Sequence, residues 1–113
     1  MLEKVVEIGL LFDFYGEILT AKQQEAILLY YYDDLSLGEI AERLGISRQA
    51  VYDHLHRGED ILREYEKKLG LVAKYRRLKE EIDDLASYID KHQLENEIKK
   101  GILERVEKIK KHL

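Results

Sequence analysis

A single short segment carries side chains that could bond nucleic-acid bases and phosphates. Seven candidates lie in it: Ser47, Arg48, Gln49, Tyr52, Asp53, His56 and Arg57. Arginine can make a bidentate contact to guanine, and glutamine can make one to adenine. A serine at the start of a helix lies beside backbone N–H groups that have no partner within the helix, and together these can hold a phosphate. The residue types therefore indicate a surface that contacts both bases and backbone phosphates.

Three residues in or near this segment leave its target open. Asp53 repels phosphate unless it accepts a hydrogen bond from a cytosine amino group. His54 is largely neutral at pH 7 and adds little attraction. Tyr52 could stack on a base or contact a phosphate, but it could equally pack against Tyr65 or the first helices. We predict nucleic-acid contact through this segment, and a motif that serves only as a structural scaffold is the alternative.

The spacing of apolar and small residues predicts that residues 36–57 form a helix-turn-helix. The first helix has one apolar stripe, made of Leu37, Ile40 and Leu44. Ala41 permits a close approach of the second helix, Gly45 can adopt a positive φ without steric cost, and Ile46 fills the angle between the helices. The second helix starts at Ser47 and returns apolar side chains to the same core: Ala50, Val51 and Leu55. A plain helical hairpin with a glycine turn is the alternative.

The rest of the chain is predicted to be helical as well. Its 113 residues include no proline and only seven glycines, so little interrupts the runs of good helix formers. Thr20 with Gln23, and Ser36 with Glu39, have the form of capping boxes at helix N-termini. We place the helix-turn-helix domain at residues 1–68.

Residues 69–113 have the pattern of two amphipathic helices. The first apolar seam is spaced alternately four and three residues apart, at Leu71, Tyr75, Leu78, Ile82, Leu85 and Ile89. The second consists of Leu94, Ile98, Ile102, Val106, Ile109 and Leu113. Because each large side chain contributes about 1.5–3 kcal/mol when fully buried, both faces must pack on each other, on the first domain or on a second subunit. The polar joint at residues 91–93 favours a hairpin, regular heptads favour a homodimer, and the two are compatible.

The charge of the chain is unevenly distributed. Net charge is −4, which lowers the expectation of promiscuous nucleic-acid binding, because phosphate neutralisation supplies most non-specific affinity. Residues 1–19 and 20–68 each carry a net charge of −3, whereas residues 69–113 carry +2. A basic cluster in the last part is either an ordinary solvated helix face or a source of phosphate contacts, and it consists of Lys74, Arg76, Arg77 and Lys79.

Composition and spacing argue against several functional classes. The chain has no cysteine, which removes disulfides, thiolate metal sites and cysteine nucleophiles. His54 and His56 point about 200° apart on a helix and cannot chelate one ion. We find no phosphate loop and no nucleophile–base pair, so we expect neither an enzyme, nor a cofactor, nor a metal site. The acidic start is unlike a signal peptide, and no apolar run approaches the ~20 residues of a membrane span, so we expect a cytoplasmic protein that does not insert into a membrane.

The residues around the helix-turn-helix resemble two known groups of proteins. Residues 20–32 (TAKQQEAILLYYY) and 35–57 (LSLGEIAERLGISRQAVYDHLHR) are similar to the region of sigma factors that reads the −35 promoter element. With Leu10–Tyr15 ahead and Asp60–Tyr65 behind, the chain more closely resembles the YlxM-like family of bacterial helix-turn-helix proteins, over roughly its first ninety residues. Sigma-like helices tend to carry basic or small polar residues at the positions that Asp53 and His54 occupy here.

The resemblance implies an all-α fold: a sigma-region-4-like helix-turn-helix bundle with a C-terminal helical extension or hairpin. The YlxM-like family is proposed to act in, or to regulate, the signal recognition particle pathway. We therefore expect a DNA-binding regulatory protein that could take part in this pathway. The alternative is an accessory protein of the particle that binds its RNA or its GTPase components and uses the helix-turn-helix as an interaction scaffold.

Overall fold

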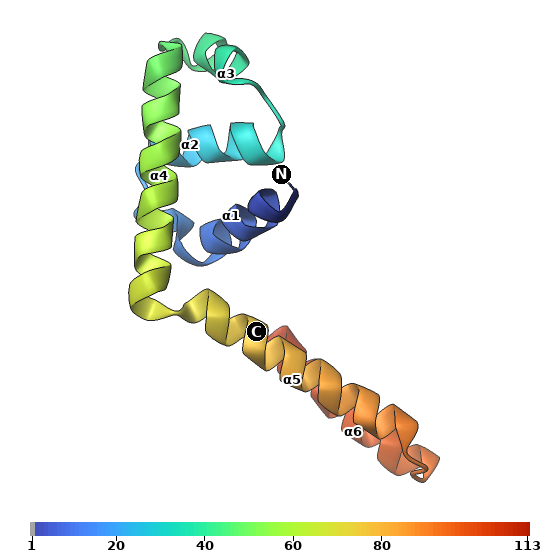
Figure 1. Cartoon of the computed structure of the whole chain (residues 1–113). Coiled ribbons are helices and arrows are strands. Elements are labelled where there is room, and N and C mark those ends of the chain that lie inside the picture. The colour runs from blue at the N-terminus through green and yellow to red at the C-terminus, as the bar shows by residue number, and fades with distance from the viewer. Residues whose placement is uncertain (1) are drawn as a thin grey trace. The chain divides into compact units, whose positions relative to one another are not determined.

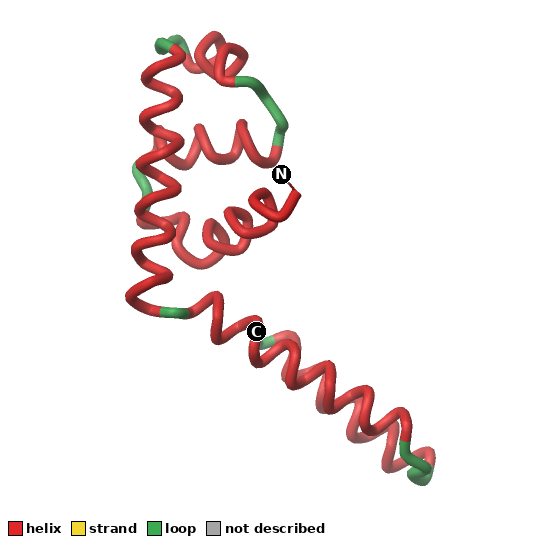
Figure 2. Tube along the Cα trace, viewed as in Figure 1, coloured by secondary structure: helices red, strands yellow, loops and turns green. Residues whose placement is uncertain are grey.

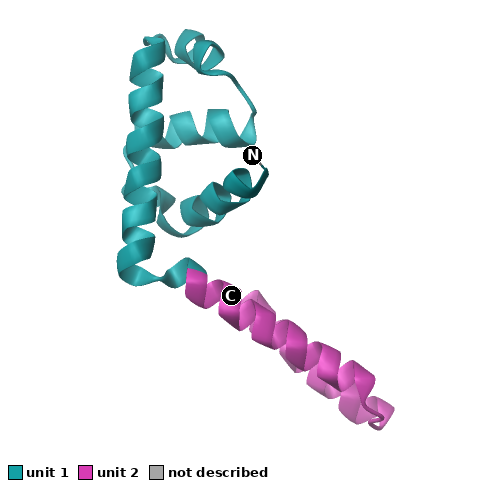
Figure 3. Cartoon of the chain, viewed as in Figure 1, with its two compact units in different colours: residues 1–72 teal, residues 73–113 magenta. Residues whose placement is uncertain are grey.

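The computed structural model describes residues 2–113, and it divides the chain into two compact units, residues 1–72 and 73–113 (Figure 3). Within the described residues every regular element is a helix and the remainder is loop or turn (Figure 2). The prediction of an all-α fold is therefore confirmed. None of these helices is both long and apolar enough to cross a membrane.

The first unit consists of three short helical segments that pack along one side of a long helix (Figure 1). Its elements are α1 (Leu2–Tyr15), the 3-10 turn η1 (Gly16–Ile18), α2 (Ala21–Ile27), the π-helical turn η2 (Leu28–Tyr32), α3 (Leu37–Leu44) and α4 (Arg48–Leu69). Both predicted capping boxes form: the Thr20 and Ser36 hydroxyls accept hydrogen bonds from the backbone N–H groups of Gln23 and Glu39. The side chains of Gln23 and Glu39 bond back to the cap residues, so each helix begins where the sequence predicts.

Helix α4 is the element against which the others pack, and it continues without a break through Gly58. A Cβ atom built on Gly58 would lie 2.9 Å from Cδ1 of Ile27, a fully buried residue of α2. Glycine at this position therefore permits the close approach of α2 to α4. The main core surrounds this crossing and includes Ile8, Leu11, Tyr15, Leu19, Ala26, Ile27, Leu55, Leu62 and Val72.

The C-terminal end of α4 is held by hydrogen bonds to a buried tyrosine. Gly70 ends the helix with a φ of 64°, and α5 (Leu71–Lys91) begins directly after it. The Tyr15 hydroxyl donates to Oε1 of Glu66 at 2.7 Å and accepts from the Leu71 N–H at 3.1 Å. The Val72 N–H bonds the same Glu66 oxygen, so the backbone N–H groups of Leu71 and Val72, the last residues of the first unit, have partners within that unit.

The second unit is a helical hairpin made of α5 and α6 (Asn96–Lys111). Two ion pairs join the helices: Lys110 Nζ lies 3.1 Å from Oδ1 of Asp83, and Lys99 Nζ lies 3.5 Å from Oδ1 of Asp90. Since the later residue of α6 pairs with the earlier residue of α5, the helices run antiparallel. The hairpin that the polar joint predicted is therefore present.

Candidate nucleic-acid interface

The predicted helix-turn-helix is formed by α3, a short turn and the start of α4. Gly45 ends α3 in the left-handed conformation with a φ of 68°, and the Ile46 N–H bonds back to the Ala41 carbonyl. The Ser47 hydroxyl then accepts a hydrogen bond from the Ala50 N–H at 3.0 Å and caps α4. Since residues with a Cβ rarely adopt this φ, a glycine at position 45 is what allows so short a turn.

A small core beneath the turn sets the orientation of the two helices. Ile40 of α3 and Val51 of α4 are fully buried, and Ala41 is buried between them. Partly buried side chains surround this core: Leu29, Tyr30, Leu35, Leu37, Leu44 and Ile46. With Val51 and Leu55 facing inward, the opposite side of the first turns of α4 faces solvent.

The candidate residues on α4 occupy more than one face of the helix. Gln49, Tyr52 and Asp53 are exposed side by side, and His56 is half-buried next to Tyr52, with ring centroids 4.1 Å apart. Arg48 and Arg57 are both exposed, but nine residues at about 100° each place them on opposite sides of this row. The structure thus brings Gln49, Tyr52 and Asp53 together and places the two arginines at the two borders.

Arg48 lies against the first turn of α3. A Cβ atom on Gly38 would lie 3.1 Å from both Nε and Nη2 of Arg48, so the guanidinium rests over this glycine. Ser36, Glu39 and Glu42 line the same groove between the two helices. Gly38 is therefore a positioning residue that the sequence analysis did not identify, although a glycine in the first turn of a helix is a visible signal.

Gln49 and Asp53 form a hydrogen-bonded pair on the exposed face. Nε2 of Gln49 donates to Oδ1 of Asp53 at 3.0 Å, one helical turn further along. This bond orients the amide and leaves its carbonyl oxygen and second N–H available to a base edge. Asp53 therefore has a structural partner, which the sequence analysis did not anticipate.

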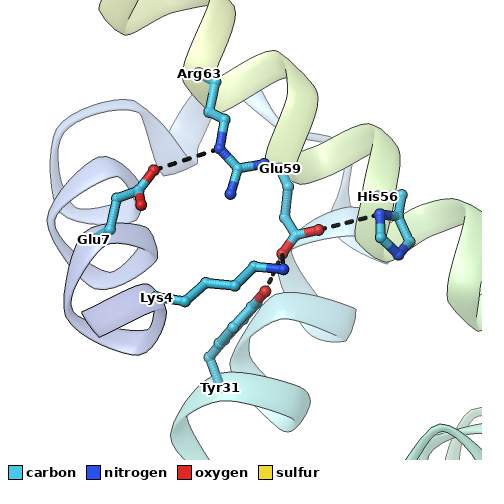
Figure 4. A network of polar contacts seen from close by, with 6 residues as sticks. All are labelled: Lys4, Glu7, Tyr31, His56, Glu59 and Arg63. Carbon is cyan, nitrogen blue, oxygen red and sulfur yellow. Dashed lines mark hydrogen bonds and ion pairs between the residues drawn. The ribbon is translucent and has the colours of Figure 1, made fainter. Parts of the chain in front are cut away.

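The candidate row is linked to a polar network inside the first unit (Figure 4). Glu59 of α4 is only 1% exposed, and its carboxylate lies 3.4 Å from Nδ1 of His56 and 3.6 Å from Nζ of Lys4. The Tyr31 hydroxyl donates a hydrogen bond to the same carboxylate. Beside this group, Nε of Arg63 lies 3.4 Å from Oε1 of Glu7. His56 is thus anchored to the interior on one side and exposed on the other.

The sequence contained a signal for this network that the analysis missed. Glu59 is four residues after Leu55 and three before Leu62, so it lies on the apolar stripe of α4. A carboxylate at such a position must find partners when it is buried. Burial, together with the hydrogen bond to Glu59, raises the pKa of Tyr31 well above the ordinary value of 10.0.

The helix-turn-helix fold agrees with the description of a known protein family that the chain matches. A family model described as "Putative helix-turn-helix protein, YlxM / p13 like" matches residues 2–111. The chain belongs to the UPF0122 family. UPF0122 proteins of Bacillus cereus (strain AH187) and Bacillus anthracis (strain A0248) are each 47% identical to it over 109 residues, which cover 96% of this chain and 99% of each relative.

Membership in the UPF0122 family confirms the resemblance that the helix-turn-helix sequence indicated. The match spans both units, so the hairpin of α5 and α6 belongs to the family as much as the helix-turn-helix does. The family description names a helix-turn-helix and no target for it. The chemistry of the exposed residues therefore has to supply the functional argument.

Proposed function

We propose that this UPF0122 protein is a cytoplasmic DNA-binding regulatory protein rather than an enzyme. The observation that carries the proposal is the exposed row at the start of α4. There the side chains of Gln49, Tyr52 and Asp53 face solvent together and take no part in the hydrophobic core. In helix-turn-helix proteins the first turns of the second helix enter the major groove. A row of polar side chains that is rigidly supported by Val51 and Leu55 suits that position.

The first residues of α4 each have a role in this proposal. Gln49 reads an adenine through its amide, which the bond to Asp53 already orients. Arg48 reads a guanine or contacts a phosphate from its place over Gly38. The N–H groups of Arg48 and Gln49 precede the first intrahelical hydrogen bonds of α4 and can bind a phosphate, while the Ser47 hydroxyl already serves as the cap.

Fluorescence anisotropy with a randomised pool of labelled duplexes, followed by selection of the retained sequences, tests this proposal. We expect retention at low salt, an affinity that falls as salt is raised, and a changed preference in Arg48→Ala and Gln49→Ala. Lys68→Ala is the matched control, because Lys68 is equally exposed but lies near the far end of α4. If no duplex is retained at low salt, the proposal is wrong.

A second candidate function is favoured by the charge of the first unit. Residues 1–72 carry eight basic and fourteen acidic side chains, a net charge of −6, which opposes tight binding to any polyanion. We infer that the first unit could instead bind a basic surface of a protein, and the YlxM-like character of the chain indicates the GTPase components of the signal recognition particle. Capture assays with the isolated GTPase and with the isolated RNA of the particle, together with measurements of GTP turnover, show which of these two components the protein binds.

A further inference from the structure

The hairpin of α5 and α6 has an apolar edge that its own two helices do not cover. Leu78 and Leu85 of α5 are 38% and 45% exposed, and Ile98 and Ile109 of α6 are 53% and 51% exposed. Only two large side chains of residues 73–113 are buried, Ile89 and Val106. A helical unit of about forty residues normally needs additional burial, a metal or a partner subunit to be stable.

The exposed aliphatic residues of both helices lie along the same edge of the hairpin. On α5, at about 100° per residue, Asp83 and Asp90 lie on one side of the buried Ile89, and Leu78 and Leu85 lie on the other. On α6, Lys99 and Lys110 likewise lie on one side of the buried Val106, with Ile98 and Ile109 on the other. The ion pairs between these lysines and aspartates lie along one edge of the hairpin, so the aliphatic side chains lie along the opposite edge.

Charge indicates which partner fits this aliphatic edge. Where the two helices lie side by side, residues 80–90 of α5 carry five acidic and no basic side chains. Helix α6 carries six basic and three acidic side chains, a net charge of +3. Two ion pairs already join this acidic segment of α5 to the basic α6, and a second copy of the hairpin offers the same two surfaces again.

We propose that two copies of the chain dimerise through these edges and form an antiparallel four-helix bundle. The two-fold axis runs along the hairpin, so that α5 of each copy lies between its own α6 and the α6 of the other copy. The acidic residues 80–90 of each α5 then have a basic α6 on both sides, whereas the alternative two-fold arrangement would place the acidic segments of the two α5 helices against each other. The aliphatic edges form the core, as in four-helix bundles generally, and the interface is isologous.

The arrangement assigns a partner to two exposed charges at the border of the aliphatic edge. Glu81 of α5 and Lys108 of α6 are both exposed, and they lie at similar heights along the hairpin, near the Asp83–Lys110 ion pair. On its own helix, each lies on the side of the aliphatic residues that faces away from the ion-paired edge. In the dimer, Glu81 of one copy faces Lys108 of the other, twice per dimer.

A charge-exchange experiment on the full chain, without nucleic acid, tests the dimer. Light scattering of the unmodified chain at micromolar concentration should give twice the 13.4 kDa of one chain. Glu81→Lys alone and Lys108→Glu alone should each raise the dissociation constant about tenfold or more, because each places like charges together twice. A mixture of the two variants, one of them mass-tagged, should form a heterodimer at the unmodified affinity in native mass spectrometry.

Two further results decide the question. Leu85→Glu should give a monomer, and far-ultraviolet circular dichroism checks whether this variant keeps its helical content. If it unfolds, the charge-exchange pair still provides the test. The proposal is overturned if the unmodified chain is monomeric at about 100 μM, or if the mixture forms no heterodimer while each variant alone is weakened. A monomer would leave the DNA-binding proposal unaffected.

Discussion

Nδ1 of His56 lies 3.4 Å from Oε2 of Glu59, one helical turn further along α4. The histidine borders the exposed row that begins at Gln49, whereas the glutamate is 1% exposed and bonded by Tyr31. This pair therefore connects the candidate interface to the contact between α4, η2 and α1 (Figure 4). Changes in the buried network should reach the candidate interface through this histidine.

Removal of the Glu59 carboxylate should destabilise the first unit. Glu59→Ala leaves the Tyr31 hydroxyl without its acceptor inside the fold and opens a cavity, so we expect a loss of about 2–4 kcal/mol in the free energy of unfolding. Urea denaturation followed by circular dichroism measures this loss. Glu64→Ala is the control, because Glu64 is exposed on the same helix and pairs only with exposed Lys68, and it should change stability by less than about 1 kcal/mol.

The pH dependence of stability should contain a term from Tyr31. Burial and the hydrogen bond to Glu59 raise its pKa above the ordinary 10.0, so the folded state holds the phenolic proton more tightly than the unfolded state does. The contribution is therefore complete below about pH 10 and decreases as the pH rises further. Thermal unfolding between neutral and alkaline pH should show this decrease, and Tyr31→Phe should reduce its slope. An equal slope in the unmodified chain and in Tyr31→Phe would contradict this role of Tyr31. Burial also raises the pKa of Tyr15, so Tyr15 accounts for part of the pH dependence that remains in the variant.

The packing of Gly58 against Ile27 should produce strong coupling between the two positions. In the unmodified chain, Gly58→Ala places a methyl group 2.9 Å from Cδ1 of Ile27, and the resulting strain of about 1–3 kcal/mol outweighs the helix-propensity gain of about 1 kcal/mol. Ile27→Val removes that Cδ1 atom. In the Ile27→Val background, Gly58→Ala should therefore stabilise the protein. A double-mutant cycle in urea gives the coupling energy, and additive effects would show that α2 and α4 can separate at no cost.

The Gln49–Asp53 pair should balance affinity against selectivity in DNA binding. Asp53→Asn keeps an acceptor for the Gln49 amide and removes a negative charge that repels phosphate. We expect non-specific duplex affinity to rise about threefold to tenfold and the preference among sequences to become weaker. Anisotropy with a selected duplex and a scrambled duplex measures both quantities. Glu64→Gln is the charge-matched control, because Glu64 is exposed on the same helix and lies far from the row.

The local structure of this protein was predictable because short-range chemistry controls it. Gly45 between two apolar stripes, together with a threonine and a serine that are each followed three residues later by a capping partner, determines where helices begin and end without reference to the rest of the chain. The polar joint at residues 91–93 favoured the hairpin on equally local grounds. These features predicted the helix-turn-helix, and the resemblance of residues 20–32 and 35–57 to known sequences indicated the family.

Only the tertiary structure decided how the exposed row of α4 is supported. The contacts of Lys4 and Tyr31 with Glu59, and the packing of Arg48 over Gly38, depend on how separate helices pack. In the hairpin, the heptad seam divides, because Ile89 turns inward while Leu78 and Leu85 remain exposed. Sequence periodicity shows that a helix face is apolar, but which neighbour covers that face is settled by the geometry of the packed chain. Among the seven candidates of the helix-turn-helix, the structure exposes Gln49, Tyr52 and Asp53 side by side. Two arginines border this row, and His56 connects it to the buried Glu59.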